Sequence, residues 1–408
     1  MARRRKIRIK KGPVFLLALF LIGLFFILNY GIKTYNEKNT ASNDNNNSNN
    51  VTKPSDNNDK NQEKTYKLSL LATGDGLIHS VIYRSYYQNN KYDFSSALSE
   101  VKDIISKYDL AYYNQETPLG DSSIEYSGYP RFYTPKEYGE AMINIGFNMI
   151  SLASNHAYDK GENGIIKTLD YFNTTDVLYH GMNRNEKDTQ NYNIKEKNNI
   201  TYTMLSYTTL DNGLSSLLGN NQYMVNKYSK EKVKKDIEAL RDKVDVLIVA
   251  MHWGVEYTPN PTSEQKEIAQ YLADLGVDIV IGNHPHVLQP ITWIDDTLVM
   301  YSLGNFISNQ YGTDDYNKLI GFLATLDITK TVKDNKSEIK IDNLGGELIF
   351  TYYIGDPINT AVHSGHKVIP FSKMTNNTYL KDYERLYTKY SDILKRMGTN
   401  LNIVPLPS

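Results

Sequence analysis

The chain has 408 residues, a length that accommodates two or three domains and a substantial buried core. Its 45 lysine and arginine residues nearly balance 46 aspartate and glutamate residues, which argues against a globally basic nucleic-acid-binding protein. The chain contains no cysteine, so a lipoprotein anchor, a disulfide framework and thiolate metal ligands are excluded.

The N-terminus has the organisation of a membrane signal anchor. Residues 1–12 form a basic head, and residues 13–32 contain the uncharged apolar run from Val14 to Leu28. Because no small-residue cleavage site follows this run, we expect an uncleaved, single-pass transmembrane helix, with a cleaved signal peptide as the alternative. The positive-inside rule places the basic head in the cytoplasm and the remaining chain outside the cell membrane, as an extracellular domain.

The composition divides the rest of the chain into three parts. Residues 33–65 are rich in Asn, Asp, Lys, Ser and Thr and carry almost no apolar side chains, which predicts a disordered linker. Residues 66–370 carry the apolar patterns of a folded domain. Residues 371–408 form a C-terminal tail that we expect to be helical or irregular.

Strands and helices alternate in the first part of the folded domain, which predicts an α/β core. The predicted strands are 67–73, 109–114, 147–152, 244–251 and 277–281. The predicted helices are 135–145, 230–243 and 263–275, the last with Ser263 as its N-cap. From residue 297 onward the pattern favours strands, at 297–302, 319–328 and 347–354.

Polar residues gather where five of these strands end. They are Asp75; Asn114 and Glu116; Asn155, His156 and Asp159; His252 and Glu256; and His284 and His286. Any one of them alone has an ordinary explanation as a turn, a cap or a packed histidine. Ligands of open α/β sheets bind at the carboxyl ends of strands, so we expect the five loops to form one site.

The donor atoms of this set suggest a metal centre. They are oxygen and nitrogen only, which suits divalent Mn, Fe or Zn. Their number exceeds what one tetrahedral ion needs, and a pair of ions bridged by a carboxylate accounts for the surplus. Such pairs stabilise the attacking and leaving oxygens in phosphoester hydrolysis.

Six motifs in this order resemble the CapA family of capsule-synthesis proteins, which includes the membrane-anchored component of bacterial poly-γ-glutamate synthesis. The motifs are Gly74-Asp75, Asn114-x-Glu116, Ser154-Asn155-His156-x-x-Asp159-x-Gly161, His252-Trp253-Gly254-x-Glu256, Gly282-Asn283-His284-Pro285-His286-Val287-x-Gln289-Pro290 and Tyr301-Ser302-Leu303-Gly304-Asn305-Phe306. The resemblance covers residues 66–370, and it implies a role in capsule or poly-γ-glutamate biosynthesis.

That family is in turn similar to calcineurin-like metallophosphoesterases, which implies a four-layer α-β-β-α sandwich with two metal ions. The resemblance implies that Asp75 and His286 hold one ion, that Asn155, His252 and His284 hold the other, and that Glu116 bridges them. It implies catalytic roles for His156 and Asp159, with His156 as general acid or phosphate-orienting group. Asn114, Glu256 and Asn305 are expected to bind substrate or support the site.

The sequence departs from the wider phosphoesterase pattern at two positions. Leu77 stands where that pattern has a histidine, two residues after Asp75. We do not expect His79 to substitute, because its side chain leaves the turn in another direction. Glu116 occupies a bridging position that is aspartate in phosphoesterases, so one metal position has few ligands.

The sequence leaves three functions open. The first is a metallophosphoesterase-like domain that hydrolyses a phosphoester or transfers nascent polymer. The second is a non-catalytic scaffold for polymer assembly or tethering, and the third is a surface phosphoesterase unrelated to capsule. The expected partners are the membrane, an anionic polymer or phosphoester substrate, and a membrane complex for polymer synthesis, but not nucleic acid.

Overall fold

The computed structural model describes residues 63–311, 313–334 and 336–407. The predicted basic head, the predicted anchor and almost the whole predicted linker lie outside these ranges. Within the described ranges, no helix is both long and apolar enough to cross a membrane. The described residues belong to a single unit that spans Asn61–Ser408.

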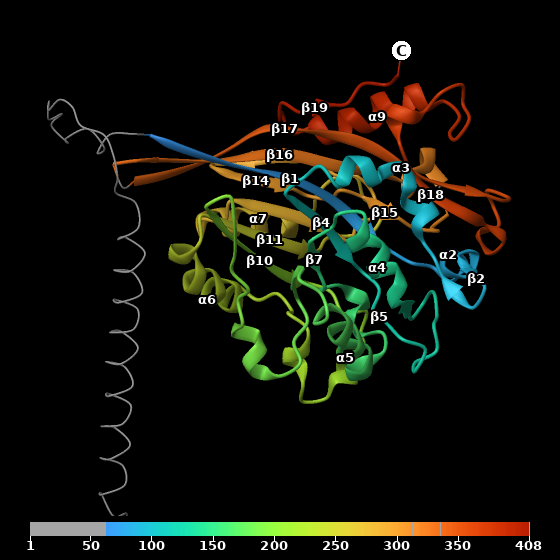
Figure 1. Cartoon of the computed structure of the whole chain (residues 1–408), viewed down its shortest axis with the longest axis horizontal. Coiled ribbons are helices and arrows are strands. Elements are labelled where there is room, and N and C mark those ends of the chain that lie inside the picture. The colour runs from blue at the N-terminus through green and yellow to red at the C-terminus, as the bar shows by residue number, and fades with distance from the viewer. Residues whose placement is uncertain (1–62, 312, 335, 408) are drawn as a thin grey trace, which may run out of the picture. The chain divides into compact units, whose positions relative to one another are not determined.

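The larger of two main sheets has nine strands and mixes parallel with antiparallel neighbours (Figure 1). Its order is β18-β17-β16-β1-β4-β7-β8, with β15 beside β1 and β19 beside β17. Strands β1, β4, β7 and β8 are parallel, whereas β16, β17 and β18 extend the sheet in antiparallel fashion. The strands are β1 (Lys64–Gly76), β4 (Leu110–Gln115), β7 (Met149–Ser151), β8 (Leu178–His180), β15 (Asn305–Ile307), β16 (Ile320–Lys333), β17 (Lys336–Ile354), β18 (Ser364–Pro370) and β19 (Asn402–Ile403).

The smaller main sheet has six strands in the order β13-β14-β12-β11-β10-β9. Its central strands β10, β11, β12 and β14 are parallel, so their carboxyl ends lie along one edge. The strands are β9 (Lys195–Lys197), β10 (Ile200–Thr208), β11 (Val246–His252), β12 (Ile279–Asn283), β13 (Ile291–Ile294) and β14 (Thr297–Met300). Two short ribbons, β2 (Tyr87–Gln88) with β3 (Lys91–Tyr92) and β5 (Leu119–Gly120) with β6 (Thr134–Pro135), lie outside both sheets.

The two sheets pack face to face. Successive side chains of a strand point to opposite faces, so each sheet has one face toward the other sheet and one face outward. Leu70 on β1 and Tyr112 on β4 belong to the same buried cluster as Ile248 on β11 and Ile281 on β12. Leu71, the neighbour of Leu70, belongs to a separate cluster on the outer face of the larger sheet. Strand alternation therefore builds one core between the sheets and one on each outer face.

Helices cover both outer faces, which gives the layer order α-β-β-α (Figure 1). Helices α3 (Ser95–Ile105), α4 (Lys136–Asn144) and α5 (Gly161–Phe172) pack on the larger sheet. Helices α6 (Lys230–Leu240) and α7 (Ser263–Asp274) pack on the smaller sheet. The remaining helices are α2 (Ser80–Ser85), α8 (Thr313–Tyr316) and α9 (Tyr383–Lys395), and the 3₁₀ turns are η1 (Asn155–Tyr158), η2 (Glu186–Gln190), η3 (Ser215–Leu218), η4 (Gln222–Met224), η5 (Arg241–Lys243), η6 (Thr360–Val362) and η7 (Phe371–Lys373).

The mixed α/β fold predicted from the sequence is confirmed, with one local difference. The N-cap of α7 is Thr262 rather than Ser263, because the Thr262 side chain accepts a hydrogen bond from the Gln265 amide and Gln265 completes a capping box. The segment after residue 370, which we expected to be helical or irregular, contains the helix α9 and the short strand β19. Leu386 and Leu394 on α9 lie in the core between the sheets, and β19 pairs with β17.

Candidate metal centre

Asp75 and Asn114 lie opposite each other at the carboxyl ends of β1 and β4, both fully buried. The Asn114 amide donates a hydrogen bond to Asp75 Oδ1 at 2.8 Å. The backbone amide of His284 donates to Asp75 Oδ2 at 3.1 Å, and this bond joins the two sheets. Asn114 therefore holds the Asp75 carboxylate in a fixed orientation.

His284 and His286 occupy the loop after β12, where both have left-handed backbone conformations with φ of 94° and 59°. Such conformations are unfavourable for residues other than glycine and occur preferentially at functional sites. They bring His286 Nδ1 to 3.3 Å from Asp75 Oδ2 and His286 Nε2 to 3.6 Å from Glu116 Oε1. Asn305 Oδ1 lies 2.9 Å from His286 Nδ1 and positions the ring from behind.

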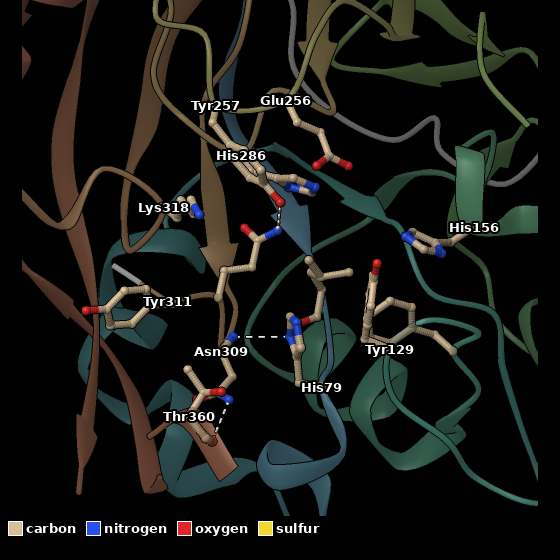
Figure 2. A pocket seen from close by; sticks show the side chains of 13 residues that line it. His79, Tyr129, His156, Glu256, Tyr257, His286, Asn309, Tyr311, Lys318 and Thr360 are labelled. Carbon is tan, nitrogen blue, oxygen red and sulfur yellow. Dashed lines mark hydrogen bonds between the residues drawn. The ribbon is translucent and has the colours of Figure 1, made fainter. Parts of the chain in front are cut away.

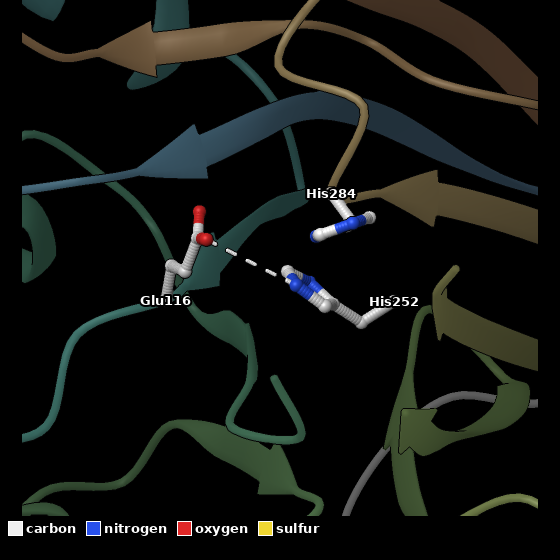
Figure 3. Close-up of side chains that lie close together, drawn as sticks. All are labelled: Glu116, His252 and His284. Carbon is white, nitrogen blue, oxygen red and sulfur yellow. Dashed lines mark ion pairs between the residues drawn. The ribbon is translucent and has the colours of Figure 1, made fainter. Parts of the chain in front are cut away.

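Glu116 reaches the same place from the loop after β4 (Figure 3). Its carboxylate lies 3.9 Å from His252 Nε2, at the end of β11. His252 Nε2 also lies 2.9 Å from Asn155 Oδ1, so Asn155 and His252 face each other across the two sheets. The side chains of Glu116, Asn155, His252 and His284 thus converge from four separate segments of the chain.

Burial controls the protonation of these groups. It raises the pKa of Glu116 well above its usual value and lowers the pKa values of His252 and His284 well below theirs. Burial also lowers the pKa of His286, but the carboxylates of Glu116 and Asp75 outweigh it and raise that pKa to about 9. His252 and His284 are therefore neutral at pH 7, the state in which imidazole binds metals.

The residues present fit a divalent metal centre. Three groups of side chains have ligand atoms that all lie within 4.8 Å of one another: Asp75, Glu116 and His286; Glu116, His252 and His284; and Glu256, His284 and His286. Both Glu116 carboxylate oxygens, Asn114 Oδ1 and His284 Nδ1 are buried without a hydrogen-bond partner. Because buried carboxylate oxygens are costly unless they are paired or bind a cation, this donor set suits a hard or intermediate divalent ion.

His156 faces the centre from η1, with Asp159 behind it. The distance from His156 Nδ1 to Asp159 Oδ2 is 2.8 Å, and Asp159 Oδ2 also accepts a hydrogen bond from the Phe132 amide at 2.6 Å. The His156 ring packs edge-on against Phe132, with their centroids 4.7 Å apart. Asp159 and Phe132 therefore fix the ring and leave Nε2 as its free nitrogen.

A cavity of about 350 Å³ opens beside His156 and His286 (Figure 2). Leu77 and Glu256 line it next to these histidines, and three tyrosines form part of its walls, Tyr129, Tyr257 and Tyr311. Lys318 is the one lysine or arginine among its lining residues, and its Nζ lies 4.0 Å from the centre of the Tyr257 ring. The cavity thus places a positive charge near the candidate metal centre.

The eleven candidate residues meet around this centre, either at its core or in direct support of it. Asn114 contacts Asp75, Asn305 contacts His286 and Asp159 contacts His156. His79 is in none of the three groups of possible metal ligands found among the described residues. Its Nδ1 lies 3.2 Å from both Leu77 O and the Asn309 amide. Sequence reasoning missed Tyr257 and Lys318. Tyr257 follows a motif residue, whereas Lys318 belongs to no motif.

Comparisons with known proteins place the chain among capsule-synthesis proteins. The chain is 32% identical over 183 residues to the capsule biosynthesis protein CapA of Bacillus anthracis, an alignment that covers 43% of each chain. It is 31% identical over 178 residues to the PGA biosynthesis protein CapA of Bacillus subtilis (strain 168), with 43% of this chain and 47% of that protein covered. The chain thus spans less than half the length of either relative.

The matches to solved structures are weak, both in sequence identity and in TM-score. A phosphatase from Mycoplasma pneumoniae is 14% identical with a TM-score of 0.40, covering 69% of this chain and 95% of that one. GAP50, the anchor in the inner membrane complex of Plasmodium, is 10% identical with a TM-score of 0.31, covering 84% and 98%. The model of the bacterial capsule synthesis protein family PGA_cap matches residues 69–310, which make up more than half of the chain and contain all six motifs. The chain therefore belongs to the PGA_cap family of bacterial capsule synthesis proteins.

Proposed function

We propose that this chain is a membrane-anchored protein of capsule or poly-γ-glutamate biosynthesis, whose extracellular, metallophosphoesterase-like domain binds two divalent ions. This domain hydrolyses a phosphoester or transfers nascent polymer. The observation that carries the proposal is the buried Glu116 carboxylate, which has no hydrogen-bond partner and is surrounded by ligand groups from both sheets. Family membership supports the biosynthetic role, and the sequence of residues 13–32 supports the anchor.

In this proposal the buried groups divide between two ions. Asp75 and His286 would hold one ion, Asn155, His252 and His284 would hold the other, and Glu116 would serve both. When bound, such ions stabilise the negative charge that develops on the oxygens of a phosphoester. Asn114 and Asn305 keep Asp75 and His286 oriented through hydrogen bonds of 2.8 and 2.9 Å, so the ligand geometry exists before substrate arrives.

His156 and Asp159 are suited to move a proton. His156 in its protonated form donates the Nε2 proton to the departing oxygen of the substrate. Asp159 accepts the Nδ1–H hydrogen bond and stabilises the protonated ring before transfer. Lys318, on the wall of the same cavity, attracts an anionic substrate such as a phosphoester or an acidic polymer.

Metal analysis and turnover of the purified full-length chain test the enzymatic part. We expect two divalent ions per chain and hydrolysis of bis-p-nitrophenyl phosphate that His284→Ala abolishes. His284 is a suitable target because it belongs to two of the three ligand groups. A chain without stoichiometric metal and without turnover contradicts the enzyme.

A non-catalytic role in polymer assembly or tethering is the second candidate. Leu77 favours it, because an apolar side chain stands at a position where a metal ligand is expected, and it is 2% exposed at the cavity wall. Deleting the protein should remove the surface polymer from the cell. Restoration of polymer by a His252→Ala, His284→Ala variant supports the scaffold, whereas unchanged polymer after deletion supports a surface phosphoesterase unrelated to capsule.

A further inference from the structure

We propose that Glu256 is a metal ligand that compensates for Leu77 and completes the ion site formed by Asp75 and His286. The inference rests on the proposed metal-dependent function and assigns to Glu256 a direct contact with the ion. It explains how a site with an apolar residue at position 77 retains enough donors. Three observations support it: the position of the Glu256 carboxylate, the backbone that holds it and the lack of a lysine or arginine partner.

The Glu256 carboxylate lies close enough to two candidate histidine ligands to bind the same ion. One of its oxygens and ring nitrogens of His284 and His286 are all within 4.8 Å of one another. His286 also belongs to the group with Asp75 and Glu116, so Glu256 shares a histidine with that group and would add a donor to the ion held there. Leu77 lines the same cavity but has no donor atom.

Backbone hydrogen bonds on both sides of Glu256 bring it to this position. The Trp253 amide donates to Asn283 O at 3.1 Å, and the Tyr257 amide donates to Pro285 O at 2.8 Å. These two bonds attach the loop after β11 to the loop that carries His284 and His286. Glu256 therefore faces the histidines because its loop is fixed to theirs.

The same loop has an unfavourable backbone conformation immediately after Glu256. Tyr257 has a φ of 64°, a left-handed conformation that is unfavourable for a tyrosine. Gly254 has a φ of 87°, and a Cβ atom there would lie 2.5 Å from Gln265 Oε1. Local strain of this kind persists where the surroundings impose it, and here it turns Glu256 toward the centre.

Glu256 also has no ion pair with a lysine or arginine among the residues that the structure describes. Its side chain is exposed at the cavity, in contrast to Glu116, which is 1% exposed. A carboxylate that has no lysine or arginine partner and lies beside two histidines is available to an ion. Its exposure also lets it adjust to the ion without rearranging the core.

Manganese binding by the full-length chain tests this assignment independently of activity. The chain is stripped with a chelator, and Mn²⁺ bound per chain is measured by equilibrium dialysis with elemental analysis. Electron paramagnetic resonance reports the coupling of paired Mn²⁺ ions. We expect two coupled ions in the wild type, and a Glu256→Gln variant that binds one of them at least about 10-fold more weakly and loses the coupled signal.

Two further variants keep the test specific. Glu264→Gln removes an exposed glutamate in the first turn of α7 and should bind both ions like the wild type. Leu77→His added to Glu256→Gln supplies a donor at position 77 and should restore the second ion. Circular dichroism of the metal-free proteins confirms that each variant is folded.

The outcomes separate this inference from the proposed function. Two coupled ions bound by Glu256→Gln with wild-type affinity overturn the role of Glu256 and leave the metal centre intact. No stoichiometric Mn²⁺ in the wild type overturns the proposed function itself. Loss of one ion that Leu77→His restores supports the assignment.

Discussion

Asp159 is the residue on which the proposed proton transfer depends, because it holds the His156 ring from behind. Asp159→Asn keeps the size of the side chain but replaces the charged acceptor of the Nδ1–H bond. We expect kcat for bis-p-nitrophenyl phosphate to fall by roughly 10²-fold or more, since general acid catalysis contributes about 10²–10⁴-fold. Bound metal should stay at the wild-type level, because Asp159 is in none of the three ligand groups described.

Asp121→Asn is the matched control for that measurement. Asp121 is exposed and pairs with Lys167 at 3.1 Å, away from the cavity residues. It should change neither kcat nor metal content. Equal activity of Asp159→Asn and Asp121→Asn would show that His156 does not need its carboxylate partner.

His180 is a buried histidine whose protonation we expect to limit stability in acid. Burial, together with the charge of Lys232, lowers the pKa of His180 to about 4 from an ordinary value of 6.5. Its Nδ1 accepts a hydrogen bond from the Ser206 amide at 2.8 Å, which requires an unprotonated nitrogen. The pKa of His180 is lower in the folded protein than in the unfolded one. Neutral His180 therefore contributes fully to the free energy of unfolding above pH 6.5, and this contribution is lost as the pH falls toward 4.

The His180→Asn variant retains an acceptor and removes the titrating group. Between pH 7 and pH 4, the free energy of unfolding should fall less in the variant than in the wild type, by about 3 kcal/mol. Urea unfolding of the metal-free protein at both pH values measures the difference. Identical pH dependence of the two proteins would exclude His180 as a source of acid sensitivity.

At the scale of elements, the close approach of β12 to the segment after β14 sets the position of the histidine loop. A Cβ atom on Gly282 would lie 2.0 Å from Tyr301 O and 2.6 Å from Trp253 Nε1. These two atoms share a hydrogen bond of 3.0 Å. Only glycine therefore fits at position 282 without moving its neighbours. The loop with His284 and His286 begins just after it.

Gly282→Ala should destabilise the protein by about 3 kcal/mol, because overpacking forces the backbone apart. It should also weaken metal binding, since the displaced loop carries two ligands. Gly213→Ala is the comparison without a steric clash: its φ of 71° disfavours alanine, but a Cβ atom there would meet nothing within 4 Å, so we expect a smaller loss of stability. Urea unfolding that gives equal losses for the two variants would argue that steric contact at Gly282 is unimportant.

The order of strands and the polar residues after them were sufficient to predict the common location of the candidate residues. Asp75 and Asn114 meet because β1 and β4 are parallel neighbours, a consequence of the α/β pattern. The position of Lys318 was not predictable, because it lies between β15 and β16 and reaches the cavity only through the long-range pairing of β16 with β1.

Local signals were also ambiguous at the ends of elements. Thr262 and Ser263 are adjacent and both are good N-caps, so only the hydrogen bond to the Gln265 amide identifies Thr262. The orientation of Glu256 depends on the bond between the Tyr257 amide and Pro285 O, which joins two loops far apart in sequence. Periodicity within a segment carries no information on such contacts.

At the scale of the whole molecule, the described unit contains its own cores, and the proposed anchor precedes it. The clusters that fill the three cores use residues between 66 and 406. We expect the full-length chain to fractionate with membranes and a chain starting at residue 61 to remain in the soluble fraction. Sequencing the mature N-terminus distinguishes an uncleaved anchor, which begins at Met1 or Ala2, from a cleaved signal peptide.

The candidate centre has contributions from both sheets: Asp75, Glu116 and Asn155 come from the larger, and His252, His284 and His286 from the smaller. Neither sheet alone carries a complete set of donors, so an ion bound here would cross-link the two sheets. An ion that binds only the folded protein raises the free energy of unfolding by RT ln(1 + [L]/Kd), where [L] is the free concentration of the ion. Chelation should therefore lower the free energy of unfolding, and in the proposed extracellular location the metal supply would set the stability of the protein.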